Sequence, residues 1–285
     1  MNRLVFSSLL ATVVANVIPC FYNTAYEENN FLDHQGYTLK TAKNCYVLID
    51  TDNFNSHGAV INYTNALKIN NNTIGCYMSV GTVEDWRSDF QQFIKGQDYQ
   101  SKGWPEWPGE YMIKAGSDGK IADNVVSLMK KRIDKFSKLG CEYIEFDNMD
   151  IDEYNKMTNI NGNAMRAYNL ELCNYVHSNK LKCMAKNTGP SDADDNIFDG
   201  LSVESYPKEL NWWGTEHALN FTNNNKPFMI SHYKENTVKD CLKIWKYYRG
   251  VYKYNKFGFI CSQYETKHYI HYIHFGYKIN LTNLG

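Results

Sequence analysis

One twelve-residue segment concentrates acidic side chains that could act as catalytic groups. Residues 142–153 hold six acidic residues and no basic one. If residues 143–147 form a strand, period-two alternation places Glu145 and Asp147 on one face, opposite the apolar residues between them. Burying carboxylates is costly without a partner or a task. Lys186 is a candidate partner, because its ammonium would keep Asp147 ionised, as a nucleophile requires.

A second candidate acid, Glu204, ends another short apolar run, residues 201–204. Two carboxylates that face each other, one ionised and one protonated, are the standard apparatus for cleaving a glycosidic bond. Asp147 and Glu204 are therefore candidates for a catalytic pair. The structural alternative is that Glu204 caps a loop or pairs with a lysine, since ion pairs also occur at strand ends.

A third region joins acids, aromatic residues and an arginine in the loops expected after strands. Aromatic faces stack on pyranose rings, and carboxylates and arginine bind hydroxyl groups, so this composition suits a sugar site. The alternative is ordinary loop packing, with Arg87 bridging Glu84 or Asp85. The candidates from this region are Tyr77, Glu84, Trp86, Arg87 and Glu110.

These residues need a scaffold in which several strand ends meet. Short apolar runs alternate with helical patterns along the chain, which is typical of an α/β protein with a parallel sheet. Seven runs, with an eighth near residues 21–23 or 110–113, predict a single-domain (β/α)8 TIM barrel, in which polar groups at strand C-termini converge on one face. The expected strands are residues 46–50, 74–80, 143–147, 183–187, 201–204, 227–232 and 257–261.

Helical spacing of apolar residues predicts helices within residues 125–139, 165–176 and 238–248. A doubly wound sheet is the competing architecture, but it would need fewer strands and usually a glycine-rich first turn. The chain has no GxGxxG or GxxxxGK[ST] run, so no nucleotide cofactor is predicted. No linker divides the chain, which favours one domain.

Five segments follow one another in a characteristic order: residues 74–87, 107–110, 140–150, 185–187 and 203–204. Together they resemble the ordered motifs of glycoside hydrolase family 114, the endo-α-1,4-polygalactosaminidases, which have a TIM-barrel fold. The resemblance extends over most of the chain, from about Tyr46 to Tyr233.

The resemblance implies a hydrolase that cleaves an α-1,4-linked, galactosamine-containing polysaccharide within the chain. Asp147 and Glu204 match the family's catalytic acids. By analogy with related α-galactosidase barrels, Asp147 is expected to be the nucleophile and Glu204 the acid/base. The residues expected to bind substrate are Asp50, Tyr77, Glu84, Trp86, Arg87, Glu110, Asn148, Asp150, Lys186, Tyr206 and Tyr233.

Two positions depart from the family pattern. His232 precedes Tyr233 where the family tends to have Glu-Tyr, and Ser205 follows the catalytic glutamate where the family tends to have a cysteine. These departures leave open two other functions, a non-catalytic carbohydrate-binding protein on a degenerate barrel and an α-galactoside hydrolase with a different substrate. A structural wall or coat protein is a third alternative.

The net charge of −1 over 285 residues argues against a general nucleic-acid binder. An acidic mouth would nevertheless attract a polymer that is cationic where it is deacetylated. No metal site is predicted, because His268, His271 and His274 diverge whether they lie on a helix or on a strand. The acids of the expected mouth are Asp50, Glu84, Glu110, Asp147, Asp150 and Glu204.

The first residues predict a secretory signal peptide. Arg3 precedes an apolar run, residues 4–14, and a small-residue site that predicts cleavage after Ala15. The mature protein, residues 16–285, is expected to be a secreted or cell-wall-associated monomer without a membrane segment. Eight cysteines in an oxidising compartment allow up to four disulfides. Sequons at Asn62, Asn71, Asn220 and Asn280 predict glycosylation.

Overall fold

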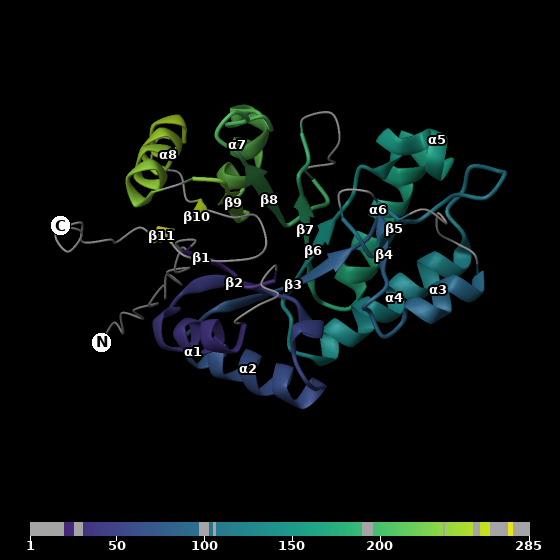
Figure 1. Cartoon of the computed structure of the whole chain (residues 1–285), viewed down its shortest axis with the longest axis horizontal. Coiled ribbons are helices and arrows are strands. Elements are labelled where there is room, and N and C mark those ends of the chain that lie inside the picture. Colours follow the sequence, from purple (N-terminus) through teal and green to yellow (C-terminus); the bar gives the residue numbers. More distant parts are fainter. Residues whose placement is uncertain are drawn as a thin grey trace, which may run out of the picture.

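The computed structural model describes residues 20–25, 31–96, 103–104, 107–189, 196–235, 237–252, 257–262 and 273–275. The fold is a (β/α)8 barrel of eight parallel strands with helices outside them (Figure 1), as the alternation of strands and helices predicts. The barrel strands are β1 (Cys20–Asn23), β2 (Cys45–Ile49), β3 (Thr73–Ser79), β6 (Tyr143–Asp147), β7 (Lys182–Lys186), β8 (Gly200–Ser205), β9 (Phe228–His232) and β10 (Gly258–Cys261).

The two segments expected to supply the eighth strand belong to different sheets. Strand β1 pairs in parallel with β2 and lies against β10, so the N-terminal segment supplies the barrel strand. Residues Glu110–Met112 instead form β5, which pairs antiparallel with β4 (Thr82–Glu84) in a separate two-stranded sheet. A further strand, β11 (Ile273–Phe275), pairs antiparallel with β10 at the closure of the barrel.

The helices are α1 (Phe31–Thr41), α2 (His57–Ile69), α3 (Phe90–Gly96), α4 (Asp123–Lys138), α5 (Asn155–Thr158), α6 (Gly162–Ser178), α7 (Thr215–Asn223) and α8 (Val238–Val251), with 3-10 turns at Thr51–Asn53 and Ile151–Tyr154. The predicted helices correspond to α4, α6 and α8. Between β7 and β8 the described residues contain no helix. Within the described residues, none of the helices has the length and apolar character that a membrane crossing requires.

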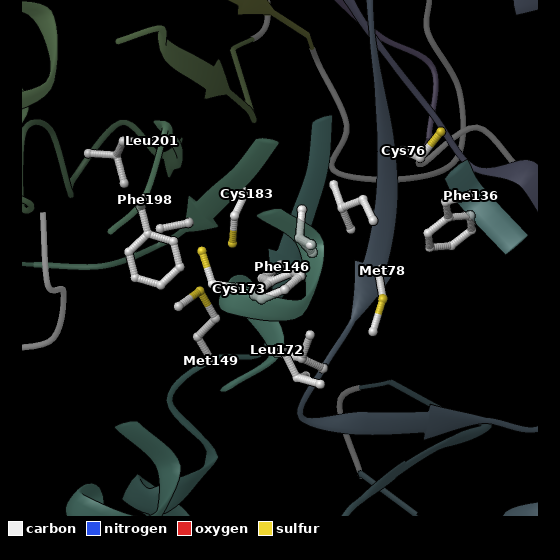
Figure 2. Close-up of a cluster of buried hydrophobic side chains, with 14 of the residues drawn as sticks. Cys76, Met78, Phe136, Phe146, Met149, Leu172, Cys173, Cys183, Phe198 and Leu201 are labelled. Atoms are coloured by element: carbon white, nitrogen blue, oxygen red, sulfur yellow. The ribbon is translucent and has the colours of Figure 1, made fainter. Parts of the chain in front are cut away.

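Apolar side chains pack in two regions, the layer between strands and helices and the barrel interior. Successive side chains of β6 point alternately into these two regions. Ile144 and Phe146 point outward into the layer between strands and helices; Figure 2 shows part of this layer, with Phe146 and Leu172 of α6 among the labelled side chains. The barrel interior is filled mainly by aromatic and long side chains. Those residues are Phe21, Ala25, Tyr46, Leu48, Tyr77, Tyr143, Met184, Met229 and Ile260. The inward face of β6 therefore carries Glu145 and Asp147, as period-two alternation predicts.

Three disulfides join neighbouring parts of the barrel: Cys20–Cys45 links β1 to β2, Cys76–Cys141 links β3 to the loop before β6, and Cys241–Cys261 links α8 to β10. The remaining cysteines, Cys173 and Cys183, are buried thiols on α6 and β7. Three of the four possible disulfides are thus present. The predicted signal peptide, residues 1–15, and the sequon at Asn280 lie outside the described residues.

Removing the disulfide that closes the longer loop should cost more stability. Cys76 and Cys141 are 65 residues apart in sequence, whereas Cys241 and Cys261 are 20 apart. Because loop-closure entropy grows with loop length, replacing the first pair by alanine should lower the free energy of unfolding by about 4 kcal/mol and replacing the second by about 3 kcal/mol. Denaturant unfolding of the two double variants measures both values. A larger loss for the shorter loop would contradict the entropic account.

Candidate active site

The C-terminal ends of β6, β7 and β8 bring two acids and one lysine together. The Nζ atom of Lys186 lies 3.0 Å from Oδ1 of Asp147 and 3.2 Å from Oε1 of Glu204. The Lys186 side chain is 5% exposed, against 14% for Asp147 and 20% for Glu204. One buried ammonium therefore bridges two carboxylates that remain accessible from solvent. Glu204 does pair with a lysine, but this lysine also joins it to Asp147.

The charge state of Lys186 follows from its neighbours. Burial by itself would lower the pKa of the ammonium, but the negative charges of Asp147, Glu204 and Glu145 outweigh it and raise the pKa above its ordinary value. Lys186 is therefore a permanent cation at any physiological pH. Glu145 is fully buried, one step below Asp147 on the inward face of β6.

Asp147 accepts two further hydrogen bonds. The Tyr77 hydroxyl donates to Oδ2 at 2.8 Å, and the backbone N–H of Asn148 donates to Oδ1 at 2.9 Å. Burial, reinforced by the charges of Asp147 and Glu84, raises the pKa of Tyr77 well above its ordinary value, so the hydroxyl keeps its proton and acts as a donor. Asp147 thus accepts from an ammonium, a phenol hydroxyl and a backbone N–H.

Two asparagines shape the backbone where β6 and β7 end. Asn148 and Asn187 directly follow β6 and β7, with φ of 56° and 53°, a left-handed conformation that asparagine tolerates well. Asn187 holds Glu204 reciprocally: Nδ2 donates to Oε2 at 2.8 Å, and the Glu204 N–H donates to Oδ1 at 2.8 Å. Asn148 Nδ2 donates to Ser79 Oγ at 2.9 Å. Asn187 was not among the predicted site residues, although it ends the Ala-Lys-Asn segment.

The Arg87 side chain is the centre of an ion-pair network behind Tyr77. Its guanidinium bonds carboxylate oxygens of Asp50 at 2.6 Å, Asp52 at 2.9 Å and Glu84 at 2.8 Å, and it lies 5.8 Å from the centroid of the Tyr77 ring. The ion pair between Arg87 and Glu84 agrees with the alternative interpretation, in which Arg87 stabilises the packing of this loop. The guanidinium largely compensates the charges of Asp50 and Glu84. Direct contact of Asp50, Glu84 or Arg87 with substrate stays a prediction.

Glu110, on β5, is a different kind of acid, because its hydrogen-bond partners are a threonine hydroxyl and an asparagine amide rather than a cation. Its Oε2 accepts from the Thr82 hydroxyl at 2.9 Å, and its residue exposure is 9%. Burial, followed by the negative charges of Glu84 and Asp147, raises the pKa of Glu110 to about 7. The carboxyl therefore changes charge near neutral pH, close to Asp147.

Comparison with known proteins identifies the family to which this barrel belongs. The model of glycoside-hydrolase family GH114 matches residues 28–274. The chain belongs to this family. It is therefore a glycoside hydrolase, and the identification confirms the resemblance that its ordered motifs carry. No sequence among curated proteins matches the chain significantly.

Solved structures similar to this GH114 chain share its fold at low sequence identity. Aspergillus fumigatus Ega3, in complex with galactosamine, has a TM-score of 0.68 at 18% identity, covering 90% of this chain and 96% of that one. The glycoside hydrolase domain of PelA from Pseudomonas aeruginosa has a TM-score of 0.58 at 12% identity, with coverage of 87% and 97%. An α-amylase from Lactobacillus plantarum has a TM-score of 0.51 at 10% identity, with coverage of 86% and 71%.

The departures of this GH114 chain from the family pattern are bonded to each other. Ser205 Oγ lies 2.8 Å from His232 Nδ1, and His232 Nε2 lies 3.0 Å from Glu235 Oε1. Burial lowers the pKa of His232, and Glu235 opposes this only in part, so the ring is neutral at pH 7. Ser205 and His232 are both fully buried, and Ser205 Oγ also bonds the Tyr248 hydroxyl. This Ser-His-Glu chain therefore has no nucleophile that substrate can reach.

The remaining predicted substrate residues of the GH114 site differ in exposure. Trp86 is 54% exposed and Asp150 is exposed, whereas Tyr233 is buried and packs against the half-buried Tyr206 with ring centroids 5.9 Å apart. Their contact with substrate stays a prediction. Among the described residues, no three His, Cys, Asp or Glu side chains form a group that could hold a metal ion; His268 and His271 lie outside those residues.

Loss of the bridging ammonium should damage both catalysis and stability. In Lys186→Met, two neighbouring carboxylates lose their shared counter-charge, so kcat should fall about 100-fold or more and the free energy of unfolding by about 3 kcal/mol. Lys182→Met is a matched control, because Lys182 begins the same strand and is exposed. Hydrolysis rates and denaturant unfolding measure the effects. Equal behaviour of the two variants would show that the bridge has no such role.

The raised pKa of Glu110 should make stability depend on pH. An acid whose pKa is about 7 in the folded state, against 4.5 in the unfolded chain, binds protons more tightly when folded, so its contribution to stability falls as pH rises from about 4.5 to 7. Relative to Glu110→Gln, the wild type should lose about 3 kcal/mol between pH 4.5 and pH 8. Urea unfolding at both pH values measures this difference, and parallel pH profiles would contradict it.

Proposed function

We propose that this protein is a secreted endo-acting hydrolase of α-1,4-linked, galactosamine-containing polysaccharide, with Asp147 as nucleophile and Glu204 as acid/base. The observation that carries the proposal is the bridge through Lys186. Two carboxylate oxygens bound to one nitrogen lie at most the sum of the two bond distances apart. This limit holds for the two lysine-facing oxygens, and a pair bridged so closely favours the roughly 5–5.5 Å carboxyl spacing of retaining enzymes, so we infer retention of the anomeric configuration.

The roles of the two acids follow from their hydrogen bonds. Asp147 is the less exposed and accepts from Tyr77, Asn148 and Lys186. Glu204 is more exposed, and among the described residues its carboxylate accepts from Lys186 and Asn187. This asymmetry supports the ionised carboxylate as nucleophile and the more accessible carboxyl as the group that exchanges protons with the leaving group and with water.

The reaction then proceeds by double displacement. A carboxylate oxygen of Asp147 attacks the anomeric carbon while Glu204 gives its proton to the glycosidic oxygen, and the bond between that oxygen and the anomeric carbon breaks. In the second step Glu204 takes a proton from water, whose oxygen attacks the anomeric carbon and releases Asp147. Two inversions at the same carbon return the product to the α configuration.

The charges around the pair support an amino-sugar polymer as substrate. Glu110 and Asp150 belong to the predicted acidic mouth, and within the described part of the chain neither carboxyl takes part in a salt bridge. Their negative charge would attract a free amine. The similarity to Ega3, whose structure contains galactosamine, supports the same substrate class.

We propose secretion on separate grounds. The N-terminal segment reads as a signal peptide cleaved after Ala15, which leaves residues 16–285 as the mature barrel domain. Three disulfides suit an oxidising compartment. The sequon asparagines Asn62, Asn71 and Asn220 are all exposed, as glycan acceptors must be. We expect the mature protein to act as a monomeric, extracellular or cell-wall-associated glycoprotein.

The two acids can be told apart by chemical rescue. Asp147→Asn and Glu204→Gln should each abolish cleavage of deacetylated α-1,4-galactosaminan, by at least about 1,000-fold, while the circular dichroism spectrum stays that of the wild type. With α-galactosaminyl fluoride and azide, Asp147→Ala should give the β-azide, because azide enters where the nucleophile stood. Glu204→Ala should give the α-azide, because azide attacks the glycosyl-enzyme from the opposite face.

Three outcomes would contradict the proposal. Azide products of the reverse configuration would exchange the two roles, and full activity in either Asn or Gln variant would remove that residue from catalysis. Saturable oligosaccharide binding by the wild type without product release would establish the carbohydrate-binding alternative. Proton NMR of the first product measures whether the wild type retains the configuration.

A further inference from the structure

Trp212 lies in the loop between β8 and α7, next to the residue that carries the proposed acid/base. Its indole Nε1–H donates to the backbone carbonyl oxygen of Glu204 at 2.8 Å. The residue nevertheless remains 43% exposed. The hydrogen bond therefore fixes one edge of the indole to the catalytic strand end and leaves much of the ring open to solvent, on the face where barrel loops bind substrate.

The neighbouring residues hold this loop rigidly. Trp213 is fully buried, and its Nε1–H donates to the Tyr252 hydroxyl at 2.7 Å. The rings of Trp212 and Trp213 meet edge to face, with centroids 5.7 Å apart and an interplanar angle of 79°. Trp213 in turn stacks on Tyr248 at 5.8 Å. The exposed indole is thus held by a buried aromatic cluster, so little conformational entropy is lost when it binds a ligand.

An exposed indole whose edge is fixed offers a ligand a preorganised apolar face. The apolar C–H face of a pyranose ring suits a large aromatic face, which offers contact area without demanding a charge. The position of Trp212 indicates which sugar of the substrate its ring would contact. An acid/base protonates the glycosidic oxygen and so stands on the side of the leaving group, and Trp212 is bonded to the backbone of that residue.

We propose that Trp212 is the binding platform for the sugar on the leaving-group side of the cleaved bond. The inference rests on the proposed function and extends it by one subsite. The two sides of the bond are then recognised by different chemistry. Carboxyl groups near Asp147, such as Glu110, act on the sugar that is attacked, and an aromatic face next to Glu204 holds the ring that departs.

Two substrates separate this role from a structural one. Deacetylated α-1,4-galactosaminan places a sugar on the leaving-group side, whereas methyl α-galactosaminide has only methanol there, which also needs a proton from Glu204 but has no ring. Trp212→Ala should lower kcat/KM for the polymer about tenfold, the loss of one aromatic contact, and leave kcat/KM for the methyl glycoside within about twofold. Trp212→Phe keeps a ring without the N–H and should lose less on the polymer than the alanine variant.

Tyr247→Ala is the matched control, because Tyr247 is a 41% exposed aromatic residue on α8 and should change neither rate. An unchanged polymer rate in Trp212→Ala would overturn the inference. Equal losses on both substrates, or on the polymer in Tyr247→Ala, would also overturn it, since they would show that Trp212 only supports the backbone of Glu204 or that the effect is unspecific. A wild type that hydrolyses neither substrate would overturn the proposed function itself.

Discussion

The site depends on one buried ammonium. Lys186 bonds both Asp147 and Glu204, and its charge is maintained because three carboxylates face it. Without that cation, two acids at the ends of β6 and β8 would repel each other where they are partly removed from solvent. The same contact sets how far apart the acids lie, and this separation decides between the two stereochemical courses of glycoside hydrolysis.

A chain of contacts connects this bridge to a second group of ion pairs. Asp147 accepts from Tyr77, the Tyr77 ring lies near the Arg87 guanidinium, and Arg87 is held by the carboxylates of Asp50 and Glu84. The buried cations Lys186 and Arg87 are therefore each balanced by neighbouring carboxylates. Acids that looked equivalent in the sequence have different tasks: Glu84 is a structural partner of arginine, whereas Glu110 has a pKa near neutrality and adds a titratable charge to the site.

The positions that depart from the family pattern form one unit. Ser205 and His232 lie on adjacent strands in register, β8 and β9, and their side chains bond each other in the buried layer. The pair thus packs behind Glu204 rather than facing substrate. It contacts Tyr248, which belongs to the aromatic cluster that also supports Trp213, so the pair is part of the packing behind the loop that follows β8.

The sequence by itself determined the barrel, the helices α4, α6 and α8, and the candidate acids, because hydrophobic periodicity and strand-end polarity are local properties. Local patterns did not decide which segment supplies the eighth strand, since Cys20–Asn23 and Glu110–Met112 are both short and apolar and only the pairing of β1 with β2 separates them. Nor did they show that Arg87 is consumed by ion pairs, that Asn187 holds Glu204, or that Trp212 stands beside it. Those facts depend on contacts between residues distant in the chain, and only the closed barrel brings such residues within bonding distance.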